Sequence, residues 1–221
     1  MGLRSRANAL PDPGASVVVI DDDFEFRESL GRLLRAVGLH PRLFASIADF
    51  LDCELPDVPT CLVLDVRLPG QSGLDFQRDL AATSVGLPII FMTGHGDIPM
   101  SVQAMKGGAI EFLTKPFRDQ DLLDAVNVGL VRDRARREDV VALSALRARF
   151  KLLTPRERAI LFQVAKGRLN KQIAADMGIT ETTVKVHRSN MMRKVKVTSI
   201  ADLCRMADKL KQLPENSGEL S

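Results

Sequence analysis

Short apolar runs alternate with segments of helical periodicity through the first 130 residues of the chain. The apolar runs occupy residues 17–20, 42–44, 61–64, 88–92 and 110–113. The segments with apolar residues at helical spacing are 25–37, 73–82, 98–106 and 119–131. Strands that alternate with helices in this way form a parallel sheet with helices on both faces. The sequence therefore predicts a flavodoxin-like, doubly wound, five-stranded parallel sheet.

The remaining third of the chain has a different character. The segment 131–152 lacks Gly and Pro and is rich in Arg and Ala, which predicts a helix that continues from 119–131 as a connector. Its apolar residues at roughly heptad spacing are Val140, Leu143, Leu146 and Phe150. They fit either a solvated linker helix or a helix that also pairs with a second copy. From residue 154 to 213 the pattern is helical throughout, so we expect an all-α second domain.

These patterns divide the chain into five predicted segments. They are a flexible leader (1–15), an α/β domain (16–131), a linker helix (132–150), an all-α domain (151–213) and a flexible tail (214–221). Charge follows the same division. Residues 1–130 hold 11 Lys and Arg against 18 Asp and Glu, a net −7, and residues 131–221 hold 20 against 10, a net +10. This asymmetry indicates an acidic module joined to one that meets a polyanion.

Composition narrows the cellular context. No apolar stretch approaches the roughly 20 residues that span a bilayer, and the first residues lack the apolar core of a signal peptide. The three cysteines match neither a zinc pattern nor a disulfide framework. We therefore expect a cytoplasmic protein with reduced thiols and no membrane partner.

Acidic residues stand where two of the predicted strands end. Asp21 and Asp22 follow the first strand, and Asp65 follows the third. Ligands of a doubly wound sheet bind outside the carboxyl ends of its strands. If the first and third strands are neighbours, these carboxylates converge, and they raise each other's pKa unless a cation joins them. Carboxylate oxygens suit Mg²⁺ (or Mn²⁺), so the sequence predicts a divalent-cation site here.

Two more polar residues end strands at the same edge of the predicted sheet. Thr93 ends the fourth strand, and Lys115 follows the fifth. A metal ion, a hydroxyl and an ammonium around one carboxylate would stabilise negative oxygens carried on that carboxylate. Asp65 is then expected to act as a nucleophile toward phosphorus and to form an aspartyl phosphate. Each residue alone is weak evidence, and the combination carries the prediction.

This combination, over residues 15–130, resembles a response-regulator receiver domain. The resemblance implies that Asp65 is the phosphoacceptor and that a sensor histidine kinase is the donor. It also implies that Asp22 binds Mg²⁺ directly and Asp21 mainly through water. The backbone carbonyl of Arg67 is the further metal ligand that the resemblance implies.

The resemblance also implies how phosphorylation of Asp65 would change the structure at a distance from the site. The Thr93 hydroxyl would move inward, and Phe112 could swing into the vacated space, although ordinary core packing is the alternative for Phe112. The face of the fourth helix and fifth strand would change and serve as a dimer patch. The residues expected in this patch are Val102, Lys106 and Glu111. A cis bond is expected between Lys115 and Pro116.

Capping signals in the last third of the chain indicate a helix-turn-helix. Thr154 and Glu157 stand at the spacing of a capping box. Asn170 is expected to cap the next helix, Gly178 to permit a tight corner, and Thr180 to cap the helix after it. Two helices joined by so short a Gly-containing turn form a helix-turn-helix, and its second helix enters the major groove.

Polar and basic residues of that second helix are the candidate DNA contacts. Lys185, Arg188 and Ser189 lie at i, i+3 and i+4 and share one face. His187 is expected to pack or to cap a helix rather than to read a base, but it remains a candidate. The groove-facing candidates are Thr182, Lys185, His187, Arg188, Ser189 and Asn190. The phosphate-contact candidates are Lys171, Arg193, Lys194 and Lys196.

This half resembles the four-helix DNA-binding domain of the LuxR type, which lacks a wing, and the whole chain resembles the FixJ/NarL branch of response regulators. The run TGHGDIPMSVQAMKGGAIEFLTKPF is similar to the FixJ-like group. The resemblance implies a transcriptional regulator whose phosphorylation at Asp65 promotes homodimers through the receiver. Dimers would place two recognition helices on promoter half-sites, with RNA polymerase as a further partner. NarL-like members often carry Lys where this chain has Ser189, so their base preference is not carried over.

Two functions of other classes remain open. One is a phosphohydrolase that uses Asp65 through a covalent intermediate, but the sequence shows no substrate pocket beyond the phosphoryl site. We therefore expect no enzyme activity apart from the receiver's own phosphorylation and dephosphorylation. The other is an adaptor whose helical domain binds protein after phosphorylation. The net charge of +10 argues against it, and a steep fall of DNA affinity with salt would exclude it.

Overall fold

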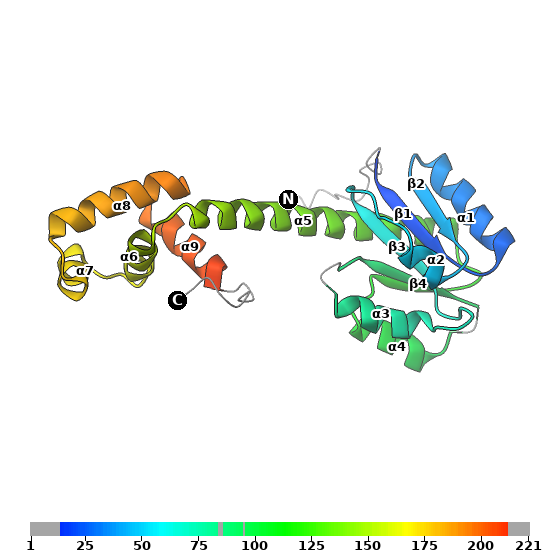
Figure 1. The fold of residues 1–221 in the computed structure, drawn as a ribbon. Helices are drawn as coiled ribbons and strands as arrows, with labels where there is room; N and C mark the ends of the chain where they lie inside the picture. The colour runs from blue at the N-terminus through cyan, green and yellow to red at the C-terminus, as the bar shows by residue number, and fades with distance from the viewer. Residues whose placement is uncertain (1–13, 84–85, 95, 212–221) are drawn as a thin grey trace, which may run out of the picture. The chain divides into compact units, whose positions relative to one another are not determined.

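The computed structural model describes residues 14–83, 86–94 and 96–211 of the 221-residue chain. These residues belong to two compact units that divide between Glu138 and Asp139 (Figure 1). The predicted tail and residues 1–13 of the predicted leader lie outside the described residues.

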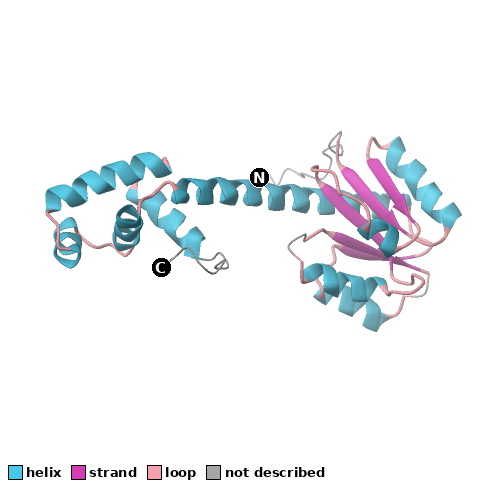
Figure 2. Cartoon of the chain, viewed as in Figure 1, coloured by secondary structure: helices cyan, strands magenta, loops and turns pink. Residues whose placement is uncertain are grey.

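The first unit is built on a five-stranded parallel sheet (Figure 2). Its strands are β1 (Ser16–Ile20), β2 (His40–Phe44), β3 (Thr60–Asp65), β4 (Ile89–Thr93) and β5 (Glu111–Thr114). Their order is β2-β1-β3-β4-β5, so β1 and β3 are neighbours. The predicted doubly wound sheet is confirmed, and the carboxyl ends of β1 and β3 meet at one edge.

Helices cover both faces of this sheet. They are α1 (Phe24–Ala36), α2 (Ile47–Leu51), α3 (Gly73–Ala81), α4 (Ile98–Lys106) and α5 (Asp119–Lys151). One apolar cluster joins α1 and α5 to one face, where Leu34 and Leu122 pack with Val19. A second cluster joins α2, α3 and α4 to the opposite face, around Phe50 and Phe91. Alternate strand residues therefore serve opposite cores, which is why the strands are apolar along their whole length.

Two helices correct or extend the sequence analysis. Helix α2 was not anticipated, because five residues are too few for helical periodicity to emerge in a window of about 11–18 residues. It is nevertheless capped, since the Ser46 hydroxyl accepts a hydrogen bond from the Asp49 amide at 3.1 Å. Helix α5 continues without a break to Lys151, so the predicted continuation of the fifth helix is confirmed.

The second unit is helical, with α6 (Pro155–Ala165), α7 (Asn170–Met177), α8 (Glu181–Val195) and α9 (Ile200–Lys211) after the end of α5. The predicted capping box is present: the Glu157 amide donates to the Thr154 hydroxyl at 3.2 Å, and the Thr154 amide donates to the Glu157 carboxylate at 2.8 Å. Gly178 ends α7 in the left-handed conformation, with φ of +62°, and Thr180 caps α8 as predicted.

The predicted cap of α7 is wrong by one residue. Leu169 is the cap, and its amide donates to the side chain of Gln172 at 2.9 Å. Asn170 is instead the first helical residue, and its side-chain oxygen accepts from Arg188 at 2.5 Å. Asn170 therefore lies past the capping position, and its side chain links α7 to α8 instead.

The second unit has its own core, in which Ile160, Ile173, Val184 and Met191 are buried. Of the apolar residues at heptad spacing in α5, Leu146 and Phe150 pack against this core. Val140 is 55 % exposed. The two residues nearest the end of α5 thus serve the folding of the second unit. Among the described residues, no helix is long and apolar enough to cross a lipid bilayer.

Candidate functional site

Three carboxylates gather at the edge where β1 and β3 end. Asp21 follows β1, Asp65 is the last residue of β3, and Asp22 stands next to Asp21. One oxygen from each of the three lies within 4.8 Å of the others. Asp21 and Asp65 are buried, whereas Asp22 is exposed. The predicted convergence of these aspartates is what the fold produces.

Lys115 joins this cluster from the loop after β5. Its Nζ donates to Oδ2 of Asp21 at 2.6 Å and to Oδ2 of Asp65 at 2.7 Å. Desolvation lowers the pKa of Lys115, but the hydrogen bonds to Asp21 and Asp65 and the negative charges of these carboxylates together raise it by more, so it ends above its ordinary value. The lysine therefore keeps its positive charge beside Asp65.

Asp21 carries an electrostatic cost that the lysine does not remove. Burial raises the pKa of Asp21, and the opposing interactions with Lys115 and with the Asp23 amide do not restore it. The neighbouring charge of Asp65 raises it further. A divalent cation would favour the ionised form of both carboxylates. Three carboxylates with oxygen ligands at one open edge fit a hard ion such as Mg²⁺.

The other predicted members of the site lie close by in the fold. Thr93 ends β4 and is fully buried, and its carbonyl accepts the backbone N–H of Lys115 at 2.7 Å. The Arg67 amide donates to Oδ1 of Asp65 at 2.8 Å, which places the backbone of Arg67 against the carboxylate. The Lys115–Pro116 bond is cis, as predicted.

Gly96 is a member of this neighbourhood that the sequence analysis missed. A β-carbon at Gly96 would lie 3.0 Å from side-chain atoms of Thr93, Phe112 and Thr114. The loop before α4 therefore passes very close to Thr93 and Phe112, the two residues predicted to respond to phosphorylation. Phe112 is half-buried, and its ring centroid lies 6.4 Å from that of Phe91. The three residues of the expected dimer patch, Val102, Lys106 and Glu111, are all exposed on α4 and β5.

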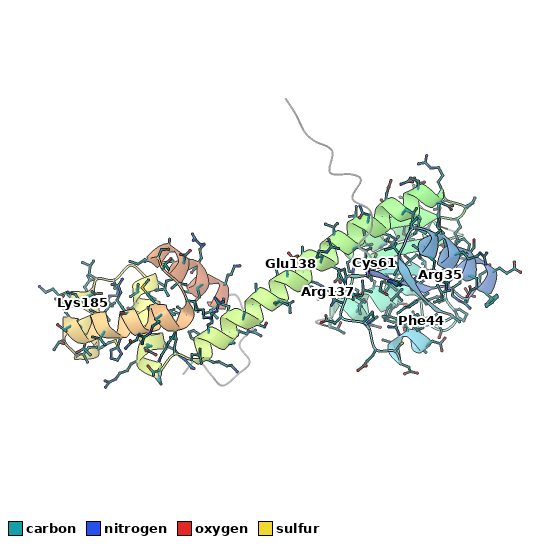
Figure 3. The ribbon with its side chains drawn as sticks, turned by 90° about the horizontal axis from the view of Figure 1, so that it is seen from above. Arg35, Phe44, Cys61, Arg137, Glu138 and Lys185 are labelled. Carbon is teal, nitrogen blue, oxygen red and sulfur yellow. The ribbon has the colours of Figure 1, made fainter. Side chains whose placement is uncertain are left out.

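In the second unit, one side of α8 carries the exposed candidates for DNA contact. The exposed candidates on this side are Thr182, Lys185, Ser189 and Arg193, and Val186 is exposed beside them (Figure 3 labels Lys185). The opposite side of the helix is buried against α6 and α7 through residues such as Val184 and Met191. Val186 is 54 % exposed and was missed, because its apolar side chain was not counted as a candidate. Lys171 on α7 is also exposed.

Other candidates on α8 have partners within the unit. Arg188 donates to Asn170 at 2.5 Å, and the side-chain oxygen of Asn190 accepts from Arg193 at 3.0 Å. Nζ of Lys194 lies 2.7 Å from Oε2 of the buried Glu157. His187, Arg188 and Asn190 are half-buried on the flanks of the exposed side.

Both units match known families. Residues 17–127 match the response regulator receiver domain, and residues 151–207 match the bacterial regulatory proteins of the luxR family. The chain is a response regulator with a LuxR-type DNA-binding domain. The carboxylate cluster thus lies in the receiver domain, and α7 and α8 are the helix-turn-helix of the DNA-binding domain.

Curated relatives and solved structures resemble this regulator along most of its length. It is 53 % identical over 196 residues to nodulation protein W of Bradyrhizobium diazoefficiens, covering 89 % of this chain and 86 % of that protein. It is 46 % identical to the transcriptional regulatory protein FixJ of Azorhizobium caulinodans, covering 86 % of this chain and 90 % of that one. The structure of the response regulator StyR aligns with a TM-score of 0.78 and 48 % identity over 88 % of this chain and 98 % of that chain. The predicted FixJ-like resemblance is confirmed.

Proposed function

We propose that the regulator is phosphorylated on Asp65 by a sensor histidine kinase. A carboxylate oxygen of Asp65 would attack the phosphorus of a phosphohistidine. The new O–P bond would form as the bond from phosphorus to the histidine nitrogen breaks, and the nitrogen would keep the electron pair. The contact of Lys115 with Asp65 supports this assignment, because it places a cation where phosphoryl oxygens would arrive.

The residues proposed to hold Mg²⁺ or Mn²⁺ are Asp21, Asp22, Asp65 and, through its carbonyl, Arg67. The bound ion would supply charge neutralisation for the transferred phosphoryl group. Lys115 is proposed to hold one phosphoryl oxygen, and the Thr93 hydroxyl another. Both side chains stand at the same sheet edge as Asp65.

We further propose that Thr93 and Phe112 transmit phosphorylation to the face of α4 and β5. The close approach of Gly96 to both side chains supports this, because a shift of either one must be accommodated by the loop before α4. Val102, Lys106 and Glu111 then form the proposed homodimer patch. An apolar residue beside opposite charges suits a contact between two identical surfaces.

The proposed DNA surface is the exposed side of α8. Thr182, Lys185, Val186 and Ser189 would face base edges in the major groove, and Lys171 and Arg193 would contact phosphates. His187, Arg188 and Asn190 stay as flanking candidates. We assign Lys194 to support of the domain rather than to phosphate, because its ammonium already pairs with Glu157. A dimer would present two such helices to promoter half-sites in the cytoplasm, with RNA polymerase as a further partner.

One comparison tests the proposal as a whole. The full chain and the Asp65→Asn variant are incubated with Mg²⁺, each with and without acetyl phosphate. Oligomer mass is measured by light scattering, and DNA affinity by fluorescence anisotropy on a duplex selected from a random library. We expect acetyl phosphate to raise the average oligomer mass, as dimers form, and to raise DNA affinity in the wild type alone.

Each part of the proposal can fail separately. Equal behaviour of all four samples would refute the phosphorylation switch but leave DNA binding standing. DNA affinity that does not fall as salt rises would contradict a contact with the phosphate backbone, because neutralised phosphates release counterions.

A further inference from the structure

The ammonium of Lys115 faces an aromatic ring as well as two carboxylates. Its Nζ lies 4.1 Å from the centroid of the Phe26 ring. A lysine ammonium has three donors, and Asp21 and Asp65 each accept a hydrogen bond from this one. The ring thus covers a side of the ammonium that the two carboxylates do not contact. The ammonium is held among three side chains of the protein.

Phe26 is itself firmly placed. Its backbone amide donates to the side chain of Asp23, the N-cap of α1, at 3.0 Å. Its ring and the Phe117 ring form a T-shaped pair, with centroids 6.0 Å apart and planes at 82°. Both rings pack against the core cluster that joins α1 and α5 to the sheet. The ring face that Phe26 presents to Lys115 is therefore set by a helix cap, an aromatic neighbour and the core.

We propose that Phe26 is a positioning residue for phosphoryl transfer, whose ring face holds the Lys115 ammonium against Asp65. This inference rests on the proposed role of Asp65 as phosphoacceptor. The negative face of an aromatic ring attracts a cation within about 6 Å, and more strongly where water is excluded. The side chain of Lys115 is only 18 % exposed, so the contact is largely shielded from solvent.

The benefit to the reaction is pre-organisation. An ammonium already fixed beside Asp65 need not reorient as charge develops on the phosphoryl oxygens. Without the ring, the flexible four-carbon side chain of Lys115 would have water on that side and more orientations to lose. Phe26 does not touch the phosphoryl group in this scheme and acts only through Lys115.

The first test compares rates of phosphorylation by acetyl phosphate with Mg²⁺. Replacing the ring by Phe26→Leu or Phe26→Met should lower the rate by about two- to thirtyfold, which corresponds to about 0.5–2 kcal/mol. Phe26→Tyr keeps a ring face and should retain the wild-type rate within about twofold. Phe24→Leu is the matched control, because Phe24 is 65 % exposed and its ring lies over Arg27. Equal rates for Leu, Met and Tyr at position 26 would overturn the proposal.

A double-mutant cycle separates positioning from packing. In a Lys115→Met background, Phe26→Leu should cause no further loss of rate if the ring acts through the ammonium. A loss as large as in the wild type would show a purely structural role and overturn the proposal. Failure of the wild type to be phosphorylated at all would instead refute the role of Asp65.

A second readout needs no variant and no reaction. Ring currents should shift the Cε protons of Lys115 upfield in NMR spectra of the full chain, since Nζ lies over the ring. Unshifted protons would show that the ammonium does not occupy this position in solution. This measurement can overturn the proposal even if the substitutions at position 26 prevent folding.

Discussion

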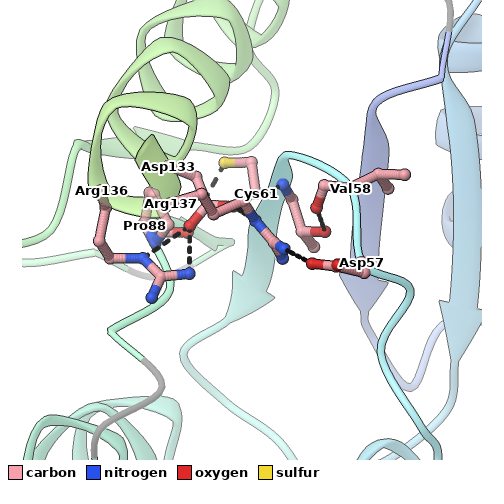
Figure 4. Close-up of polar contacts among 8 residues, drawn as sticks. Asp57, Val58, Cys61, Pro88, Asp133, Arg136 and Arg137 are labelled. Atoms are coloured by element: carbon pink, nitrogen blue, oxygen red, sulfur yellow. Dashed lines mark hydrogen bonds and ion pairs between the residues drawn. The ribbon is translucent and has the colours of Figure 1, made fainter. Parts of the chain in front are cut away.

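Asp133 on α5, which Figure 4 labels, accepts a hydrogen bond from the backbone amide of Thr60, the first residue of β3, at 2.9 Å. The same fully buried carboxylate receives Nε of Arg136 at 2.8 Å and Nε of Arg137 at 2.7 Å. Arg137 also reaches Asp57 at 2.6 Å. This network ties α5 to the start of the strand that ends in Asp65.

Removal of the Asp133 carboxylate should destabilise the receiver domain. In Asp133→Ala the Thr60 amide loses its partner at a buried position, and the two arginines lose theirs, so we expect a loss of about 2–3 kcal/mol. The midpoint of urea unfolding of the full chain, followed by circular dichroism, measures it. Asp57→Ala is the control: Asp57 is exposed, and its loss should change stability by no more than about 0.5 kcal/mol. Similar midpoints for both variants would contradict a structural role for the network.

Two aspartates should give stability opposite dependences on pH. Burial raises the pKa of Asp133, but hydrogen bonds from Arg137, Thr60 and Arg136, together with the charge of Arg136, lower it by more, so it lies below its ordinary value. Its contribution is therefore present above about pH 3.9 and lost as the pH falls toward the lowered pKa. The pKa of Asp21 is raised, foremost by burial, so its effect on stability worsens as the pH rises from about 3.9 through the raised value.

Thermal unfolding from pH 3 to 7 with a metal chelator tests these signs. Relative to wild type, Asp21→Asn should gain stability above about pH 4, because the unfavourable buried charge is gone. Asp133→Asn should lose stability over the same range and approach the wild type only in stronger acid. A destabilised Asp21→Asn at pH 7 would show that the ion pair with Lys115 outweighs the burial of the carboxylate.

Gly129 allows α5 to pack closely on β3, and a larger residue there should be destabilising. A β-carbon at Gly129 would lie 2.5 Å from Sγ of Cys61, which is fully buried. Overpacking of this kind costs about 1–3 kcal/mol, so Gly129→Ala should lower the urea midpoint. Removing the sulfur by Cys61→Ala should restore part of that loss in the double variant. Strictly additive effects of the two substitutions would mean that the clash is relieved elsewhere.

Substitutions of Lys194 and Lys171 should have different effects: the first should lower stability, and the second should weaken DNA binding. Lys194→Met leaves the buried Glu157 without its ammonium partner and should destabilise the DNA-binding domain by about 1–3 kcal/mol. Lys171→Met removes an exposed charge and should leave stability within about 0.5 kcal/mol. It should weaken binding to all duplexes alike and reduce the salt slope of log K by about 0.9 for each bound subunit. A reversed pattern, with Lys171 needed for folding and Lys194 for the salt slope, would refute the assignment.

Local patterns were sufficient for the architecture. The apolar runs and helical stripes predicted a doubly wound parallel sheet, because strands buried on both faces must be apolar along their length. The helix ends at Thr154, Gly178 and Thr180 followed from capping chemistry and from the left-handed conformation that glycine adopts freely. Two features were not predicted. Helix α2 spans too few residues to show a period, and the side chain of Asn170 accepts a hydrogen bond from Arg188 instead of capping α7.

The residues of the candidate site also fall into two groups, those that local patterns predicted and those that they did not. Asp21, Asp65, Thr93 and Lys115 were predicted to meet because each ends or follows a parallel strand, and parallel strands bring their carboxyl ends to one edge. The neighbours that tune them were not predictable in this way. Phe26 meets Lys115 across 89 positions, Thr60 meets Asp133 across 73, and Glu157 meets Lys194 across 37. Periodicity reports which side of its own element a residue occupies. Only the packing of the elements decides which distant side chain a residue contacts. The same packing decides which charged side chains are shielded from solvent, which are paired, and which stay exposed to bind DNA.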